Sequence, residues 1–350
     1  MFNHCIRLIA LAIALPSLLG LSNHSHAEQH SAVAVMYHRF GEGNFPSTSV
    51  RIEQFEAQIK FLQQNNFQVW PLAKVIEHLQ QNKSLPDKTI AITMDDGYSS
   101  IYTQAYPRLK KLGWPFTVFV STDYIDKKFP NFMSWEQMRE MEKHGADFGN
   151  HSSRHDYMVR KLKGESDAQW RQRMVEDIRH AQKRLEQELA STQKLFVYPY
   201  GEYNLALADI VAAEGLIGIG QQSGAMGPTS DFRYLPRFPV NEHYGSVADF
   251  GSKVMSRAMP LAHDPKAESV INDKRPALTF TFDKQHPRLR QFNCYFNNQP
   301  MKLEWLNDFE VQVRPQQDLA AGRSRYNCTA PSSEKGRFYW FSQQWVKAIE

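Results

Sequence analysis

The sequence is poor in cysteine, with three in 350 residues. Cys5 lies in an N-terminal segment that we expect to be removed, so only Cys294 and Cys328 remain. An even pair in an exported chain predicts a disulfide, and two buried free thiols are the alternative. Both cysteines lie far along the sequence from the histidine and aspartate motifs described below, which argues against a role as metal ligands.

The chain also lacks a strong excess of either charge. It has 41 basic and 37 acidic residues, a net charge of +4 that falls to +3 when residues 1–27 are removed. We find no basic cluster interleaved with aromatic residues, and both features argue against a nucleic-acid partner. The hydrophobic fraction of 42% and the charged fraction of 22% are ordinary for a globular protein.

The one long apolar run that we find lies near the N-terminus. Residues 8–21 are apolar, Arg7 precedes them, and residues 25–27 read Ser-His-Ala, a small-x-small cleavage site. The run is shorter than the roughly 20 residues of a spanning helix, so we favour a cleaved secretory signal over residues 1–27 rather than a membrane anchor. No cysteine follows the run at the cleavage point, which argues against a bacterial lipid anchor. We therefore expect the mature protein in the periplasm or outside the cell.

Between residues 31 and 255, short apolar runs alternate with amphipathic stretches. The predicted strands include residues 33–37, 67–70, 89–94, 115–121, 146–149, 195–198 and 216–220, and helical spacing marks residues 54–64, 72–80, 99–112, 167–189 and 205–214. This alternation predicts a parallel sheet covered by helices, and six or more such units favour a distorted (β/α) barrel over an open sheet. Polar residues that follow predicted strands would meet at the carboxyl ends of those strands. They are His38, Asp95, Asp96 and His151, joined by Pro199 and Tyr200.

The pattern changes beyond residue 255. Residues 256–276 are polar, contain three prolines and are predicted to be a linker. Residues 277–350 carry short alternating segments separated by turn residues, which predicts a small β-rich, sandwich-like domain. Its aromatic side chains would either bind sugar faces or fill the core, and we favour the core because aromatic residues are mostly buried. These residues are Trp305, Tyr326, Tyr339, Trp340 and Trp345.

Two short motifs carry the chemistry. Residues 93–97 read Thr-Met-Asp-Asp-Gly, and residues 151–155 read His-Ser-Ser-Arg-His, which would place two imidazoles on one side of a helical turn. Two histidines and one aspartate form a three-ligand set for a divalent metal, and the second aspartate is left to act as a base. Each motif alone is weak, because Asp-Asp-Gly is also a common turn and paired histidines also occur at surfaces and caps. Together they indicate a metal-assisted hydrolase.

These motifs resemble the first two motifs of the polysaccharide deacetylases, the NodB-homology family or carbohydrate esterase family 4. Residues 197–201, Val-Tyr-Pro-Tyr-Gly, resemble the third motif, and residues 36–38, Met-Tyr-His, are similar to members that act on exopolysaccharides, including poly-N-acetylglucosamine deacetylases. The resemblance covers about residues 33–245 and leaves the C-terminal domain unexplained. It implies the distorted barrel of this family over residues 31–255, a polysaccharide or oligosaccharide substrate, and one divalent metal ion. That ion is usually zinc, with cobalt, nickel, manganese and iron as alternatives.

The resemblance also implies a role for each matching residue. Asp96, His151 and His155 would bind the metal, and Asp95 would be the general base that takes a proton from a metal-held water. The backbone N–H of Tyr200 would stabilise the oxyanion, and collapse would release acetate from an N-acetyl group. Two other functions stay open, namely a degenerate deacetylase that only binds polysaccharide and an esterase that removes O-acetyl groups.

Two parts of the family pattern are missing. The third motif often begins with an arginine that orients the base, and Val197 stands there; Arg237 is our candidate substitute, with an ordinary surface or packing arginine as the alternative. The last motif supplies a histidine as the general acid and has no clean match here. His38 directly follows the first predicted strand and is better placed than His243 and His263, although a structural role explains it equally well. Either loss would predict a slow enzyme or a changed substrate, not a different reaction.

Overall fold

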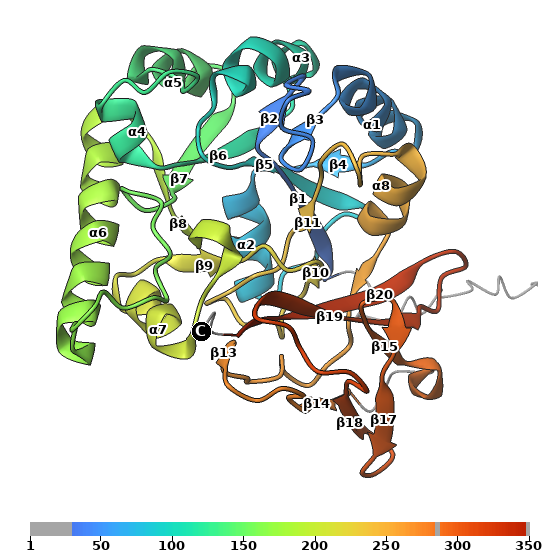
Figure 1. Ribbon diagram of the computed structural model, residues 1–350. Coiled ribbons are helices and arrows are strands. Elements are labelled where there is room, and N and C mark those ends of the chain that lie inside the picture. Colours follow the sequence, from blue (N-terminus) through green and yellow to red (C-terminus); the bar gives the residue numbers. More distant parts are fainter. Residues whose placement is uncertain (1–29, 284–287, 348–350) are drawn as a thin grey trace, which may run out of the picture.

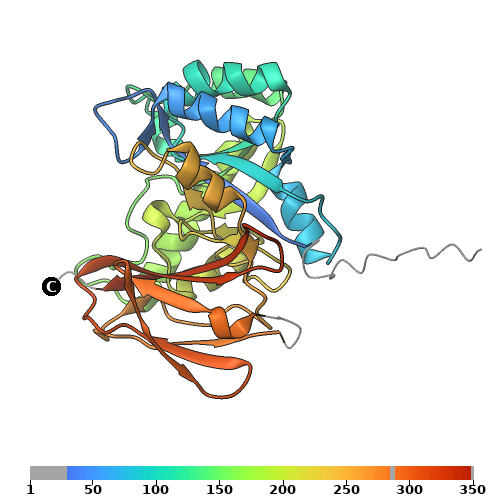
Figure 2. The same ribbon diagram turned by 90° about the vertical axis from the view of Figure 1, so that its right-hand side faces the viewer.

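The computed structural model describes residues 30–283 and 288–347. The expected signal segment, residues 1–27, lies outside them. Figures 1 and 2 show two parts, a helix-covered sheet and, below it in both views, a smaller strand-rich C-terminal part. Within the described residues, no helix combines the length and the apolar character that crossing a membrane requires.

The central sheet of the first part has nine strands, most of them parallel. Neighbouring strands follow the order β10 (Ala225–Met226), β1 (Ala32–Tyr37), β5 (Thr89–Met94), β6 (Phe116–Val120), β7 (Ala146–Asn150), β8 (Thr192–Val197) and β9 (Ile217–Ile219), with β4 (Gln68–Val69) on β5 and β11 (Phe238–Pro239) on β1. Strands β1, β5 and β6 are buried along their whole length, as expected for parallel strands that are covered on both faces. The sheet curls into an incomplete barrel, which confirms the predicted fold class.

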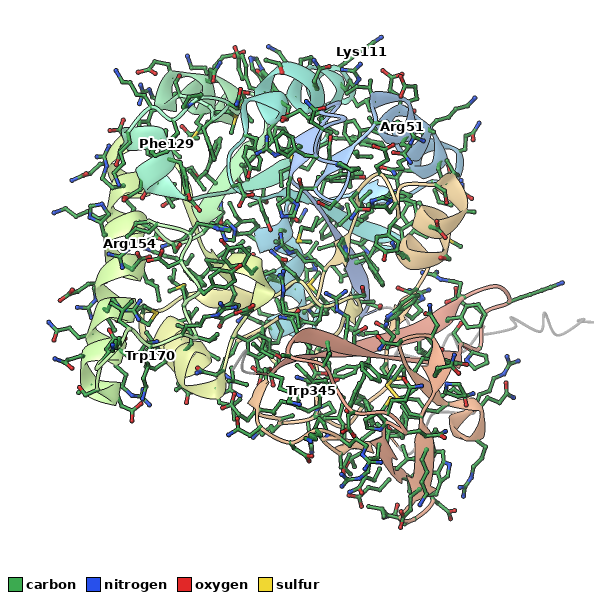
Figure 3. The ribbon with its side chains drawn as sticks, viewed as in Figure 1. Arg51, Lys111, Phe129, Arg154, Trp170 and Trp345 are labelled. Carbon is green, nitrogen blue, oxygen red and sulfur yellow. A yellow bond between two sulfur atoms is a disulfide. The ribbon has the colours of Figure 1, made fainter. Side chains whose placement is uncertain are left out.

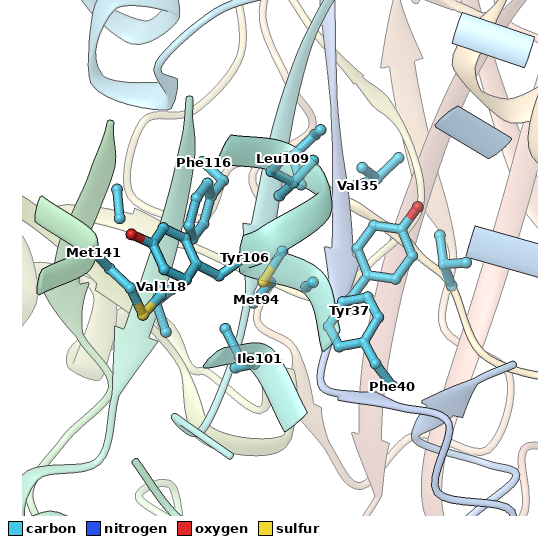
Figure 4. Packing of buried hydrophobic residues seen from close by; sticks show 14 of the residues in the cluster. Val35, Tyr37, Phe40, Met94, Ile101, Tyr106, Leu109, Phe116, Val118 and Met141 are labelled. Atoms are coloured by element: carbon cyan, nitrogen blue, oxygen red, sulfur yellow. The ribbon is translucent and has the colours of Figure 1, made fainter. Parts of the chain in front are cut away.

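Helices pack around the outside of this sheet (Figure 1). They are α1 (Ile52–Gln64), α2 (Leu72–Gln80), η2 (Ile101–Ala105), α3 (Tyr106–Leu112), α4 (Thr122–Asp126), α5 (Trp135–Glu142), α6 (Asp167–Glu188), η3 (Pro199–Gly201), α7 (Leu205–Ala213) and α8 (Val247–Val254), and β2 (Arg39–Phe40) pairs with β3 (Ser49–Val50) beside them. Figure 4 shows how the core fills the space between sheet and helices, where Met94 and Val118 from strands meet Leu109 and Met141 from helices. Each such large side chain contributes about 1.5–3 kcal/mol when it is fully buried.

An irregular segment, residues 235–239, bridges the two ends of the curled sheet. Its Leu235 pairs with β9, and its Phe238 pairs with β1. Arg237 lies between these two contacts and its side chain is fully buried. The segment therefore brings a buried cation into the interior of the sheet.

The C-terminal part consists of two small sheets and η4 (Leu289–Gln291). One sheet runs in the order β12 (Arg257–Ala258), β20 (Phe338–Lys347), β19 (Gly322–Pro331), β15 (Asn293–Phe296) and β16 (Gln299–Pro300), with β13 (Val270–Ile271) on β20, and the other contains β14 (Leu278–Thr281), β18 (Glu310–Arg314) and β17 (Lys302–Trp305). Both sheets contribute to one core, so the predicted β-rich C-terminal region is confirmed. The predicted disulfide joins Cys294 of β15 to Cys328 of β19, at directly opposed positions (Figure 3).

Residues 256–276, which we expected to be a linker, are part of the C-terminal fold. They contribute β12 and β13, and both strands pair in parallel with β20. Met259 and Leu261 between them fill the C-terminal core. The three prolines did not prevent this pairing, because they lie outside the two short strands.

The aromatic residues of the C-terminal part mostly serve packing, as we favoured. Tyr326, Tyr339 and Trp345 are buried in its core. Trp340 instead packs against the first part, where its ring meets that of Phe238 edge to face with centroids 5.3 Å apart. The hairpin of β19 and β20 therefore lies between the two cores.

Asp264, in the segment between β12 and β13, gives a testable pH dependence of stability. Its Oδ2 accepts a hydrogen bond from the backbone N–H of Asp231, and burial raises the pKa of Asp264 to about 7. The pKa of an aspartate in an unfolded chain is ~3.9. The folded chain thus holds a proton that the unfolded chain releases, so this contribution to stability is complete below pH ~4 and is lost as the pH rises to about 7.

We therefore expect Asp264→Asn, which removes the charge and keeps an acceptor, to raise the melting temperature relative to the unaltered protein as the pH rises. The gain should be largest at pH 8, of the order of a few degrees, and should shrink toward pH 5. Calorimetry at several pH values in chelator-containing buffer measures it. A gain that is larger at pH 5 than at pH 8 would contradict the assignment.

Candidate active site

Four non-glycine residues with left-handed backbone lie in the three motif loops. Their φ angles are 73° at Asp96, 63° at Ser152, 58° at His155 and 59° at Tyr200. Such a conformation costs of the order of 1–3 kcal/mol at a residue with a side chain. Of the seven other non-glycine residues with positive φ in the described chain, five are asparagines, which adopt it more readily. The strain is thus concentrated where polar side chains converge, which is the pattern of a functional site.

Asp96, His151 and His155 come together at one point. Asp96 Oδ1 lies 3.2 Å from Nε2 of His151 and 3.2 Å from Nε2 of His155. Burial opposes the ionisation of Asp96, but the two imidazoles outweigh it and hold the pKa of this carboxyl well below its usual value. Burial likewise would lower the pKa of His151, yet Asp96 and Asp95 outweigh it and raise that pKa.

A backbone carbonyl group fixes the ring orientation of His151. Its Nδ1 lies 2.8 Å from the backbone carbonyl oxygen of Val197, so Nδ1 carries the proton and Nε2 faces Asp96. Val197 occupies the position where the family often has an arginine, and here its carbonyl group orients a histidine instead.

The second motif is a loop, not the helical turn that we expected. Ser152 and His155 have left-handed backbone, and side chains hold this shape: the Ser152 N–H donates to Oδ1 of Asn150, and the His155 N–H donates to Oγ of Ser152. Asn150 thus caps the turn. Residues 151–155 contain no helix, so the conformation of this loop, and not helical spacing, brings the two imidazoles together.

Asp177 is a positioning residue that sequence reasoning missed. It is buried in α6, and its carboxylate accepts hydrogen bonds from the backbone N–H and the hydroxyl of Ser153, at 2.9 and 2.6 Å. The available signal was periodicity, because Asp177 falls on the buried stripe that includes Trp170, Met174 and Ile178.

Asp95 and Arg237 form a fully buried, two-pronged ion pair. Arg237 Nη1 lies 2.8 Å from Asp95 Oδ1, and Nη2 lies 2.8 Å from Oδ2. Arg237 also donates to Oγ1 of Thr93 and to the carbonyl oxygen of Gly220. Burial opposes ionisation of Asp95, but the charge and hydrogen bonds of Arg237 prevail and lower its pKa. The surface interpretation of Arg237 is therefore wrong, and the guanidinium orients Asp95 in the geometry expected of a substitute for the missing third-motif arginine.

His38 directly follows β1 and faces the same charges. Burial lowers its pKa, Asp96 and Asp95 act in the opposite direction, and Arg237 adds to the lowering. Within the described chain, no hydrogen bond to its ring is found. His243 is exposed, and His263 is exposed with its ring nitrogen near the carbonyl oxygen of Asp264. Of the three candidate acids, the structure brings His38 to the aspartates.

Tyr200 sits at the turn of the third motif. Its ring stacks on that of Tyr157 with centroids 4.0 Å apart and meets His155 edge to face at 4.6 Å. Among the described residues, no group accepts a hydrogen bond from the backbone N–H of Tyr200. This donor is therefore free, and it lies in a loop adjacent to the metal-ligand candidates.

A pocket opens beside Asp96 and His155, and Tyr98, Tyr124 and Phe132 also line it. Its wall is aromatic, because the ring of Phe132 lies 4.8 Å from the ring of Tyr98 and is stacked at 4.8 Å on the ring of Tyr124. Arg39 lies over the ring of Tyr98, with its guanidinium carbon 3.5 Å from the ring centroid. A polar floor with an aromatic wall suits a sugar, whose faces are apolar and whose rim carries hydroxyl groups.

The three-residue cluster fits a divalent metal. Its ligand atoms lie within 4.8 Å of one another. Asp96 Oδ1 and His151 Nε2 are fully buried, and neither meets a partner in hydrogen-bond geometry. Buried polar atoms without partners need an explanation, and two imidazoles with one carboxylate are a usual donor set for zinc or a related ion.

Comparison with known proteins agrees with this geometry. The family model described as polysaccharide deacetylase matches residues 82–218. YxkH of Bacillus subtilis (strain 168), a protein assigned to the same family, is 30% identical over 224 residues, which cover 63% of this chain and 75% of YxkH. The chain belongs to the polysaccharide deacetylase family.

Two more proteins are similar to this deacetylase, one in sequence and one in structure. It is 27% identical to the poly-β-1,6-N-acetyl-D-glucosamine N-deacetylase of Staphylococcus aureus (strain MRSA252) over 234 residues, 61% of this chain and 80% of that protein. The Streptococcus pyogenes deacetylase PplD, solved in complex with acetate, superposes with a TM-score of 0.58 at 20% identity and covers 64% of this chain and 98% of PplD. The predicted enzyme class, a polysaccharide deacetylase and thus a hydrolase, is confirmed.

Proposed function

We propose that this deacetylase is an exported, metal-dependent hydrolase that removes N-acetyl groups from a polymer of N-acetylhexosamine. The Staphylococcus aureus relative supports this substrate class by its name. The observation that carries the proposal is the buried pair of Asp95 and Arg237 beside the unpartnered ligand atoms of Asp96 and His151. A protein that only binds polysaccharide has no need of an ionised, oriented carboxylate at that place.

In this proposal the chain supplies four parts of the chemistry. Asp96, His151 and His155 hold the metal, which would act as a Lewis acid toward the acetamide carbonyl and lower the pKa of a water. Asp95 accepts the proton of the attacking water, because each of its oxygens keeps a lone pair beyond the one used by Arg237.

The remaining two parts act on the carbonyl and on the leaving amine. The free N–H of Tyr200 donates to the carbonyl oxygen as negative charge develops there. His38 is the best-placed group to donate a proton to the leaving amine. Burial lowers the pKa of His38 in the free protein, and Asp96 and Asp95 act in the opposite direction and help it to keep its proton.

Removal of the metal tests the first part. We expect prolonged dialysis against a chelator to lower acetate release from N-acetylglucosamine oligomers at least about 100-fold, and addition of zinc, cobalt, nickel or manganese to restore it. His155→Ala should not be restored by any of these ions, whereas His263→Ala should behave like the unaltered enzyme. Undiminished acetate release after complete chelation would contradict metal dependence. Release from O-acetylated but not from N-acetylated oligomers would favour an esterase instead.

A further inference from the structure

We infer that the C-terminal part belongs to the active site, because its β19–β20 hairpin positions the loop of residues 198–203, here called the Tyr200 loop. Arg323 and Gln344 are the positioning residues. The inference rests on the proposed function in one respect, namely that the N–H of Tyr200 acts during hydrolysis. It assigns to this part of the chain a role in turnover rather than in carrying a separate sugar site.

The Tyr200 loop has a backbone shape that it cannot hold alone. Tyr200 (φ 59°, ψ 4°) and Gly201 (φ 68°) are two successive left-handed residues. A Cβ atom on Gly201 would lie 2.6 Å from Cβ of Gln221, so no side chain fits there. Within the described chain no backbone N–H donates to the carbonyl oxygens of these two residues, so both oxygens need donors from side chains.

The hairpin supplies both donors. Arg323 Nη1 donates to the carbonyl oxygen of Tyr200 at 2.9 Å, and Gln344 Nε2 donates to that of Gly201 at 2.6 Å. In the hairpin Arg323 pairs with Val346, and Arg325 pairs with Gln344. Residues opposite one another and residues two apart share one face of a sheet, so Arg323 and Gln344 project from the same face.

Arg323 also reaches a buried carboxylate of the Tyr200 loop. Glu202 is almost fully buried, and its Oε1 lies 3.8 Å from Arg323 and 3.6 Å from Arg160. Arg160 lies 3.7 Å above the ring of Tyr157, which is the ring that stacks on Tyr200. Two cations from distant segments therefore meet at one buried carboxylate of the Tyr200 loop, one from the hairpin and one from the segment that follows the second motif.

The C-terminal part also contacts the chain beyond Glu202. Gln343 and Ser269 of the C-terminal part face the hydroxyl group of Tyr203, and Glu268 accepts a hydrogen bond from the N–H of Leu205 at 3.3 Å. The loop thus touches the C-terminal part from Tyr200 to the start of α7. No comparable contact from that part reaches Asp95 or Asp96 among the hydrogen bonds of the described residues. Its effect should therefore fall on the Tyr200 loop and not on Asp95 or Asp96.

Loss of these donors should lower kcat and spare KM. Removing a whole oxyanion donor typically lowers kcat by about 10²–10³-fold, so a displaced donor should lower it about tenfold. We expect Arg323→Ala and Gln344→Glu each to lower kcat for N-acetylglucosamine oligomers about tenfold, with KM changed less than about threefold. Arg323→Lys should recover much of the loss, because an ammonium group can still donate to the Tyr200 carbonyl.

Arg290→Ala is the matched control, since Arg290 is an exposed arginine of the same C-terminal part that pairs with Asp308. It should leave kcat and KM unchanged, and all variants should melt within a few degrees of the unaltered enzyme. Unchanged kcat in both Arg323→Ala and Gln344→Glu would overturn the inference. A raised KM at constant kcat would also overturn it, in favour of sugar binding by the C-terminal part. If the unaltered enzyme releases no acetate from any oligomer, the proposed function fails instead.

Discussion

Asp95→Asn is expected to lower acetate release by about 10²–10⁴-fold, the contribution usual for a general base. The amide keeps an oxygen that can accept from Arg237, but it cannot take a proton from water. Because the side chain is fully buried behind the pocket, binding of N-acetylglucosamine oligomers should change little. Acetate release measures the first effect, and titration calorimetry with the same oligomers measures the second.

Asp264→Asn provides the matched control for this substitution, since it neutralises another aspartate, away from the motif loops, whose pKa burial raises. It should retain full activity. If Asp95→Asn leaves both turnover and binding unchanged, Asp95 is not the base, and a chain that only binds polysaccharide becomes the better explanation. Loss of oligomer binding together with turnover would instead indicate that Asp95 contacts the substrate directly.

Arg237→Met is expected to lower the free energy of unfolding by about 3–5 kcal/mol, because it leaves the carboxylate of Asp95 buried without its partner. The pKa of Asp95 should rise, since the group that lowers it is gone and burial remains. Acetate release should fall with it, because the base is then neither ionised nor oriented. Denaturant unfolding of the metal-free protein measures stability without a contribution from the metal site.

Arg233→Met is the control, because Arg233 also pairs with carboxylates, Asp231 and Asp209, but at a partly exposed site. It should cost about 1 kcal/mol or less. The double variant of Arg237→Met with Asp95→Asn should regain part of the lost stability, since the unpaired buried charge is removed along with the arginine. Equal losses in the single and double variants would show that the cost comes from packing and not from charge.

The fold class followed from local pattern. Fully apolar runs such as residues 89–94, separated by amphipathic stretches, predict buried parallel strands covered by helices, and both were found. Ser134 and Gln137 form a capping box at the start of α5, another signal that lies within three residues of chain. These features depend on residues that lie a few positions apart, so they can be predicted from the sequence directly.

Other features were not predicted from the sequence, because they depend on contacts between residues that are far apart in it. The linker prediction for residues 256–276 failed, since the pairing of β12 and β13 with β20 depends on a partner about 70 or more residues away. Asp177 was not among the predicted site residues, because nothing near it in the sequence indicates Ser153 as its partner. The helical turn expected at residues 151–155 is a loop, because hydrogen bonds from neighbouring side chains stabilise left-handed backbone there.

The sequence by itself determined which chemical groups this deacetylase has: two adjacent aspartates, a histidine pair, and a Tyr-Gly turn after a strand. Only the tertiary structure decided how they are used. It brought Arg237 from the segment that bridges the sheet ends onto Asp95, 142 positions away, and it brought Arg323 onto the Tyr200 loop, 123 positions away. The physical reason is that a buried charge or a turned carbonyl group must find a partner, and that partner is chosen by proximity in the folded chain rather than along the sequence.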